Sequence, residues 1–388
     1  MQKKRMDLTV SFNLVEILYR KLTKRVFKYS VMKKGVLFFI HSVAGLFSGL
    51  FIILLSVSGA ILVFHEELDT FQKPVVGVEK TKKALLTLDS CYQVLRTHYP
   101  GAQVSHAELA ATNAAAFSFF IYDRSYRDGA KALQVFIHPT SGKILASRGG
   151  SDDTKHNMLS WLSGFHNSFQ MGKKGEWLLG FFAFVFLISI ITGNFLYRKN
   201  ILAVLLFKKS IFKRSNLHQI IGTWALLFNL MIGITGFWMQ RYVFKKEFYQ
   251  LYDYTPVLKA SPPLLYNFDT AYQRIKEKFP AFTGHVVYFA QNKKGKTALY
   301  GSNSTNSFIH SKKQADVIFL DSAGYITKTR FIDEIDAADR YDIINSQIHM
   351  GKYGGVAVKI IYSLGGLASG LLSITGFLLW VKRKRQGI

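Results

Sequence analysis

Four long apolar stretches constrain the fold of this chain more than any other feature. They cover residues 35–64, 177–197, 217–240 and 359–381, and Lys359 is the only charged residue among them. A helix needs about 20 apolar residues to cross the roughly 30 Å hydrocarbon core of a bilayer. We therefore expect four transmembrane helices in this chain of 388 residues.

Positive charge is concentrated beside these stretches. The chain has 50 Lys and Arg against 24 Asp and Glu, and twenty of the basic residues lie in residues 1–34, 198–216 and 382–388. Only Asp7 and Glu16 oppose them there. By the positive-inside rule, these three segments are cytoplasmic. The pattern predicts a multi-pass protein of a bacterial inner membrane, with both termini in the cytoplasm and the two large segments in the periplasm.

The predicted organisation follows from the spans and the charge. In chain order we expect a basic amphipathic cytoplasmic N-terminus (1–34), a first span (35–64), a first extracytoplasmic domain (66–176), a second span (177–197), a basic loop (198–216), a third span (217–240), a second extracytoplasmic domain (241–358), a fourth span (359–381) and a cytoplasmic tail (382–388). The N-terminal composition is that of a helix lying on anionic lipids, and a solvated topology signal is the alternative.

Several classes of partner and cofactor are excluded. The basic runs abut the spans and are not interleaved with aromatic residues on a folded face, which argues against nucleic acid. Cys91 is the only cysteine, so the chain has no internal disulfide, no CxxCH haem attachment and no cysteine-rich metal cluster.

An internal repeat is anchored on histidines. The first and third spans share a His, a Gly four residues later, and a Ser/Thr-Gly pair whose Gly follows the His by eighteen residues. A second His precedes the Gly of a Thr-Gly pair by twenty-seven residues in both halves. The residues are His41, Gly45, Ser58, Gly59, His166, Thr192 and Gly193 in the first half, and His218, Gly222, Thr235, Gly236, His349, Thr375 and Gly376 in the second.

Both halves start on the same side of the membrane, which makes them parallel repeats about an axis along the membrane normal. This symmetry predicts that His41 faces His218 near the cytoplasmic side and that His166 faces His349 near the outer side. Small residues of the spans, such as Gly45 and Gly222, would let a neighbouring helix or a flat ring approach closely.

Paired histidines in a membrane point to haem. An imidazole inside a bilayer is costly and is a functional candidate by default. Haem iron accepts one imidazole on each axial side, and helices that face each other can hold b-type haem without covalent attachment. We expect two haem b groups, an inner one on His41 and His218 and an outer one on His166 and His349. The alternative for each His is an interfacial residue bonded to a headgroup or a carbonyl.

His65 is a further candidate ligand. It closes the first span, and its counterpart in the second half is Tyr242. It is expected either to join the outer haem site or to be interfacial. The remaining histidines show no metal-like spacing and are expected to have ordinary surface or structural roles.

Each extracytoplasmic segment has the pattern of a small α+β unit. A helix is expected at 88–99 and strands at 115–122, 134–138 and 143–146; the second segment repeats this with a helix at 268–279 and a hairpin at 317–328. Neither segment has a nucleophile-base set, an HExxH motif or a phosphate loop, so no catalytic residue is assigned. The predicted fold class is a four-helix transmembrane bundle of two parallel-topology repeats with two extracytoplasmic α+β domains.

These residues resemble the PepSY-associated transmembrane family, also called iron-regulated membrane proteins. The resemblance rests on the His, Gly and Ser/Thr-Gly pattern and on the hairpins at 135–145 and 317–326, which are similar to the closing strands of PepSY domains. It implies a bis-haem oxidoreductase that transfers electrons to a ferric siderophore or another ferric chelate for iron acquisition. A separate donor, a quinol or a cytoplasmic reductase, is needed because the cytoplasmic segments are too short for a flavin or nicotinamide domain.

Two other functions remain open. The chain could be a non-redox binding or regulatory protein, whose spans only anchor the outer domains in the lipid. It could also be a transporter whose histidines relay protons. Against the transporter, the sequence predicts no intramembrane carboxylate and no broken helix.

Overall fold

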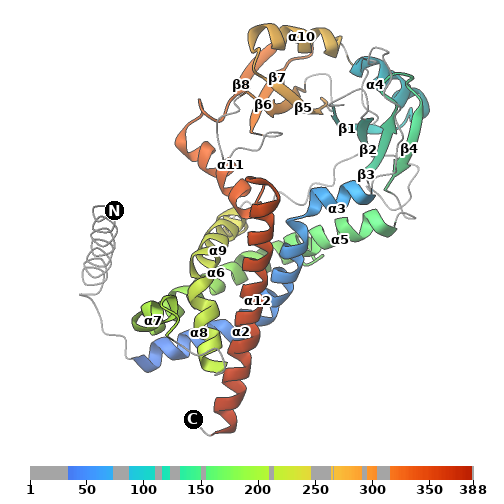
Figure 1. Ribbon diagram of the computed structural model, residues 1–388. Helices are drawn as coiled ribbons and strands as arrows, with labels where there is room; N and C mark the ends of the chain where they lie inside the picture. Colours follow the sequence, from blue (N-terminus) through green and yellow to red (C-terminus); the bar gives the residue numbers. More distant parts are fainter. Residues whose placement is uncertain are drawn as a thin grey trace, which may run out of the picture.

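The computed structural model describes most of the chain (Figure 1). The described residues are 34–72, 87–109, 116–122, 132–149, 154–208, 214–245, 264, 266–290, 295–303 and 315–386. The predicted amphipathic N-terminus, up to residue 33, lies outside these ranges. All structural statements below concern the described residues.

Long apolar helices form one end of the molecule. Three are long and apolar enough to cross a membrane: α2 (Lys34–Leu62), the stretch from Gly172 to Leu205 that begins with α6 (Gly172–Tyr197), and α12 (Gly355–Arg385). A bent pair, α8 (Arg214–Trp224) and α9 (Leu226–Gln240), would make a fourth span. Short elements, η1 (Arg198–Asn200), α7 (Ile201–Leu205) and η2 (Arg241–Phe244), follow α6 and α9.

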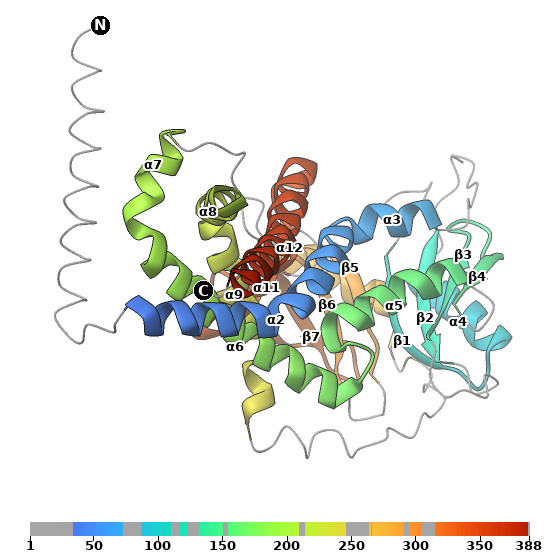
Figure 2. The same ribbon diagram turned by 90° about the horizontal axis from the view of Figure 1, so that it is seen from below.

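These helices are connected in a ring. Helix α2 packs on both α6 and α12, α6 packs on α9, and α12 packs on α8. The view from below shows α12 between α2 and α8 (Figure 2). Large apolar side chains, such as Phe39, Leu50 and Leu364, remain exposed on the outside of these helices, as expected where lipid replaces water.

The third apolar segment is not a straight helix. It bends by 62° between Trp224 and Leu226, so the expectation of no broken helix is wrong. Gly222 and Thr223 precede the bend, and the Thr223 hydroxyl donates to the Gln219 carbonyl of its own helix at 2.8 Å. A glycine beside a back-bonded Ser or Thr is a recognised cause of helix bending. Proline is not required.

Two further helices lie between the apolar helices and the sheet. Helix α5 (Thr154–Ser168) turns directly into α6, and α11 (Ala337–Met350) turns into α12. Gly351 ends α11 in the left-handed conformation, with φ of 64°, which only glycine adopts without strain. Gly175 is needed for a different reason, since a Cβ there would lie 1.6 Å from the Ser168 carbonyl oxygen. These turns bring α5 and α11 back against α2 and α9.

The two large segments between the apolar helices, predicted as two separate units, share one antiparallel sheet. Its order is β4-β3-β2-β1-β5-β6-β7-β8, with four strands from each segment. The strands are β1 (Gln103–Glu108), β2 (Phe117–Tyr122), β3 (Ala132–Ile137), β4 (Ile144–Arg148), β5 (Thr283–Tyr288), β6 (Thr297–Ser302), β7 (Asp316–Leu320) and β8 (Ile326–Arg330). The seam is the β1–β5 pair, in which Ala107 lies opposite Val287.

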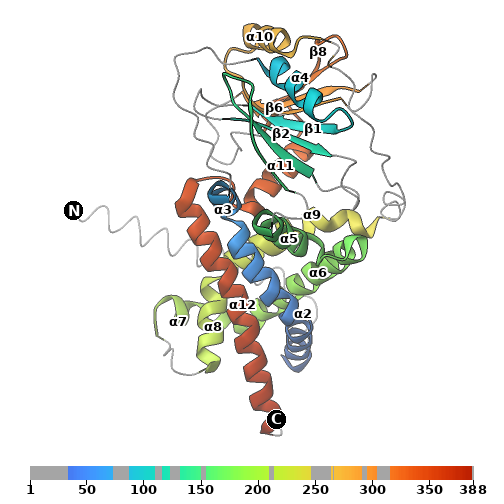
Figure 3. The same cartoon turned by 90° about the vertical axis from the view of Figure 1, so that its right-hand side faces the viewer.

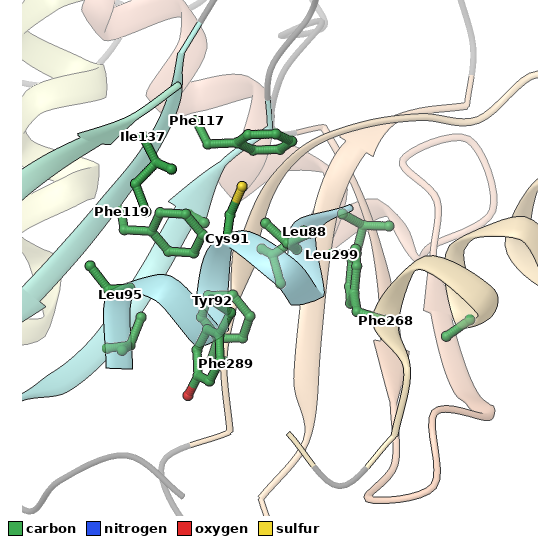
Figure 4. Packing of buried hydrophobic residues seen from close by; sticks show 14 of the residues in the cluster. Leu88, Cys91, Tyr92, Leu95, Phe117, Phe119, Ile137, Phe268, Phe289 and Leu299 are labelled. Atoms are coloured by element: carbon green, nitrogen blue, oxygen red, sulfur yellow. The ribbon is translucent and has the colours of Figure 1, made fainter. Parts of the chain in front are cut away.

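Helices α4 (Leu88–His98) and α10 (Phe268–Lys278) cover the face of the sheet that is turned away from the apolar helices (Figure 3). Cys91, Tyr92 and Leu95 of α4 and Phe268 of α10 are at most 1% exposed. They share one hydrophobic core with Phe119 and Leu299 of the sheet (Figure 4). Because this core crosses the seam, the two units are expected to fold together.

A short helix ties the sheet to the apolar helices. Helix α3 (His65–Gln72) continues from α2. Its Asp69 forms an ion pair of 2.7 Å with Arg148 of β4, and its Glu67 forms one of 2.7 Å with Lys359 of α12. The first pair fixes the sheet edge over α3, and the second joins α3 to the other half of the chain.

Candidate functional site

Two histidines from different halves face each other near the end of the apolar helices where α2 and α8 begin. His41 lies on α2 and His218 on α8, and their ring centroids are 6.3 Å apart with an interplanar angle of 68°. Two imidazoles on facing helices could hold one metal ion between them.

The hydrogen bonds of His41 fix its tautomer. Nδ1 lies 3.0 Å from the Ser189 carbonyl oxygen of α6 and 3.4 Å from the Thr192 hydroxyl. A carbonyl can only accept, so the proton is on Nδ1. The lone pair of a neutral ring is then on Nε2, the nitrogen that is free to bind a metal.

His218 is held in the same way within the second half. Its Nδ1 lies 2.8 Å from the Thr375 hydroxyl of α12. That hydroxyl donates its single proton to the Leu371 carbonyl of its own helix at 2.9 Å, so it accepts from Nδ1 of His218. Nε2 of His218 therefore also keeps its lone pair.

The outer histidines repeat this arrangement on α5 and α11. Nδ1 of His166 lies 2.8 Å from the Ser58 hydroxyl, and Nδ1 of His349 lies 2.9 Å from the Thr235 hydroxyl. Both hydroxyls donate to a carbonyl four residues earlier in their own helix, so both accept from the histidine. Burial lowers the pKa of His166 and of His349 to about 4, and His166 contributes to the lowering at His349. Burial therefore favours the neutral form of both rings.

Each Ser/Thr-Gly pair contacts the ring of one histidine. A Cβ would lie 3.1 Å from Cε1 of His166 at Gly59, 2.8 Å from Cε1 of His41 at Gly193, 3.0 Å from Cε1 of His349 at Gly236, and 3.4 Å from Cε1 of His218 at Gly376. The hydroxyl orients the ring, and the glycine makes room for it. Within each half these contacts join neighbouring helices, whereas the His41–His218 contact joins the halves.

A cavity of about 1040 Å³ surrounds the His41–His218 pair. It reaches the upper end of the range of about 300–1,000 Å³ that is usual for ligand pockets. Gly45, Ser48 and Gly222 line it, as does Asn229, whose Oδ1 accepts from the Ser369 hydroxyl. The small side chains leave space for a flat group beside the two rings.

These observations fit a haem held by two imidazoles. A metal-ligating histidine almost always donates its other ring N–H to a hydroxyl, carbonyl or carboxylate, which fixes its orientation. All four histidines meet this condition through Nδ1, and no hydrogen bond among the described residues uses their Nε2 atoms. The described residues contain no cluster of three or more His, Cys, Asp or Glu that would hold a bare metal ion, whereas haem needs only two ligands.

A family model, that of the PepSY-associated TM region, matches residues 38–383. The chain belongs to this family. The match covers nearly the whole chain, including all four histidines, the apolar helices and the sheet. The chain is therefore a membrane protein of the PepSY-associated TM region family. No curated protein matches it.

His65 of this PepSY-associated protein begins α3, just after the first apolar helix. Its side chain is largely exposed, and partial burial of the ring lowers its pKa, an effect partly opposed by the charge of Asp69. Among the described residues, no ring contact or hydrogen bond joins His65 to His166 or His349. The geometry favours an interfacial role for His65.

The sequence pattern contained Ser58, Thr192, Thr235 and Thr375 without revealing their role. Their signal was the fixed spacing of each Ser/Thr-Gly pair from a histidine. The partner of each pair is a histidine on another helix of the same half, however, and a spacing along the chain does not identify it.

His106 is a further residue with an unforeseen environment, since its ring is stacked between Phe120 at 4.2 Å and Tyr288 at 4.8 Å across the β1–β5 seam.

Proposed function

We propose that this PepSY-associated membrane protein binds two b-type haems and transfers electrons across the bacterial inner membrane. The observation that carries the proposal is the set of four histidines, each held through Nδ1 by a Ser or Thr hydroxyl or a backbone carbonyl, with Nε2 left for a metal. His41 and His218 would hold the inner haem, and His166 and His349 the outer one. When bound, these groups would supply one-electron transfer.

The proposal includes the membrane topology. The apolar helices α2, α6, α8 with α9, and α12 would form a bundle of four spans built from two parallel repeats, with both termini cytoplasmic. The basic tail of α12, Lys382 to Arg385, supports this orientation through the positive-inside rule. The eight-stranded sheet would then lie in the periplasm.

The residues of the chain have three tasks in this function. The histidines provide axial ligands, the hydroxyls of Ser58, Thr192, Thr235 and Thr375 hold the rings in one orientation, and the adjacent glycines leave room for them. A fixed tautomer and orientation raise ligand affinity, because the folding of the chain has already met the entropic cost of ordering the ring.

The proposed acceptor is a ferric siderophore or another ferric chelate on the sheet side. Reduction of Fe(III) to Fe(II) weakens binding by hard oxygen ligands, so the iron can leave its chelator. A quinol or a cytoplasmic reductase would supply the electrons. The resemblance of the sequence pattern to ferric-siderophore reductases supports this choice of substrate.

The test is the reduced-minus-oxidised absorption spectrum of the detergent-purified protein, with a pyridine haemochrome assay to count haem per chain. We expect two low-spin b-type haems. One should be lost in His41→Ala or His218→Ala, and the other in His166→Ala or His349→Ala. A colourless wild-type protein that is folded would refute the proposal and favour a non-redox, membrane-anchored binding or regulatory protein.

One observation favours the transporter as a second candidate. Broken helices are common at the substrate sites of transporters, and the α8–α9 segment bends by 62° beside the cavity. Alternating access, however, usually requires one repeat to rock against the other. The continuous sheet and the Glu67–Lys359 ion pair connect the two halves, which favours a rigid electron carrier.

A further inference from the structure

The cavity around His41 and His218 has an uneven distribution of charge. Lys382, Arg383 and Lys384, at the end of α12, line it. None of the described residues that line it is Asp or Glu. The cavity therefore combines two imidazoles and small polar groups at one end with three exposed cations at its mouth.

Two of these cations form cation–π contacts with aromatic rings. The Arg383 guanidinium carbon lies 4.2 Å from the ring centre of Phe38, which also lines the cavity, and Lys384 Nζ lies 5.4 Å from the ring centre of Trp380. Such contacts orient a cation without neutralising it. Among the described residues, no carboxylate forms an ion pair with Lys382, Arg383 or Lys384, so their hydrogen-bond donors remain available to an anion.

Haem carries two propionate side chains on one edge of its ring, and both are carboxylates at neutral pH. A haem ligated deep in this cavity can present only that edge to its basic mouth without burying a negative charge among apolar helices. We propose that Arg383, with Lys382 and Lys384, binds the propionates of the inner haem and sets its orientation. This inference rests on the proposed function, because it requires haem at His41 and His218.

The tail offers a matched control. Arg385 belongs to the same helix end but does not line the cavity. Arg383→Gln and Arg385→Gln remove the same charge from the same tail, so both weaken the topology signal equally. Only Arg383→Gln is expected to act on the haem.

The experiment measures transfer of the inner haem from the full-length protein to an excess of apomyoglobin, with the inner haem defined as the one that His218→Ala removes. We expect about tenfold weaker retention in Arg383→Gln, the typical effect of losing one charge-assisted hydrogen bond, and wild-type retention in Arg385→Gln. The same assay is then repeated with haem dimethyl ester, in which both carboxylates are blocked. Wild type and Arg383→Gln should then be equal.

The outcomes are distinguishable. If Arg383→Gln and Arg385→Gln weaken retention equally, the effect is one of general charge and the inference is wrong. If Arg383→Gln still weakens retention of the dimethyl ester, the arginine binds another anion, such as a lipid phosphate, and the inference is again overturned. A wild-type protein without haem would instead remove the proposed function itself.

Discussion

At the scale of single residues, acceptors on neighbouring helices determine which nitrogen of each histidine is free. The acceptor is the Ser189 carbonyl for His41 and a Ser or Thr hydroxyl for the other three histidines. A Ser or Thr hydroxyl within a helix often donates a hydrogen bond to the backbone carbonyl one turn earlier. Ser58 and its three counterparts do so and still accept from a histidine of a neighbouring helix. Because the hydroxyl donates its proton within its own helix, it can only accept from the histidine. It therefore fixes the tautomer of a ring that lies more than 100 positions away in the sequence.

Ser58→Ala tests this role at the outer site, because Ser58 is the hydrogen-bond partner of His166. We expect affinity for the outer haem to fall by about tenfold, the lower end of the usual effect of removing such a partner. Haem titration of the apoprotein measures it. Ser56→Ala is the control, since Ser56 is buried in the same helix but, among the described residues, forms no hydrogen bond with His166. Equal affinities in the two variants would contradict the role of Ser58.

Gly193→Ala tests whether the glycines beside the histidine rings are needed. The added Cβ would lie 2.8 Å from Cε1 of His41, a distance that Cβ atoms essentially never show, so the ring must shift from its position. We expect loss of most of the inner haem, measured by the pyridine haemochrome assay. Gly366→Ala adds the same methyl group to α12 but meets only the Ser56 carbonyl oxygen, at 3.7 Å, and does not line the cavity, so it should retain the haem. Full haem occupancy in Gly193→Ala would show that a glycine is not required at this position.

At the scale of elements, ion pairs and caps connect the two halves. The Lys359 side chain is 11% exposed, and Glu67 of α3 is its partner. Removing one member of a partly buried pair leaves the other unpaired. Because the Glu67 side chain is 38% exposed, Glu67→Gln should lower the free energy of unfolding by only about 1 to 2 kcal/mol. Thermal unfolding in detergent measures this change. The double variant Glu67→Gln with Lys359→Met should recover most of the loss; if it is less stable than Glu67→Gln alone, the explanation fails.

Helices α4 and α10 cap each other. The Asp269 carboxylate accepts from the backbone N–H groups of Leu88 and Asp89, and the Asp89 carboxylate accepts from those of Phe268 and Asp269. Burial and the adjacent Asp89 raise the pKa of Asp269 to about 6. Because this pKa is raised on folding, the associated stability is present below about pH 4 and is lost as the pH rises through 6.

The sheet should therefore be less stable at pH 8 than at pH 5. A pKa change of this size corresponds to at most about 3 kcal/mol, and the partial exposure of Asp269 reduces the expected loss to about 1 kcal/mol. Hydrogen exchange of the α4 and α10 amides in the full-length protein, followed at both pH values, measures it. Asp269→Asn should remove most of the difference between them. A pH dependence that is unchanged in this variant would assign it to another group.

The sequence predicted some elements and missed others for physical reasons. The helices at 88–98 and 268–278 and the hairpins of β3 with β4 and β7 with β8 were predicted near their observed positions. Strands β1, β5 and β6 were not. Bulges at Val104/His106 and Gly284/Val286 interrupt the two-residue alternation of β1 and β5, and Gly301 lies within β6. The pairing of β1 with β5 joins segments that are far apart in the chain, which local patterns do not report.

At the scale of the whole molecule, the orientation in the membrane is open to a direct test. Cys91 is fully buried, and burial raises the pKa of its thiol to about 12, so it should not react with maleimides. Tyr325→Cys places a thiol in the exposed β7–β8 turn, and Arg385→Cys places one at the end of α12. In spheroplasts we expect an impermeant maleimide to label Tyr325→Cys, and to label Arg385→Cys only after lysis. The reverse pattern would invert the topology.

The division of contacts between the halves has a consequence for the origin of the chain. Each histidine finds its hydroxyl and glycine within its own half, whereas the His41–His218 contact requires both halves. Under the proposed function, a half-length ancestor would have oriented its own imidazoles but supplied only one of the two that each haem needs. Two copies related by a two-fold axis would have supplied both. Gene fusion of such a homodimer would then have needed only a linker, and later substitutions could have made the two equivalent halves diverge.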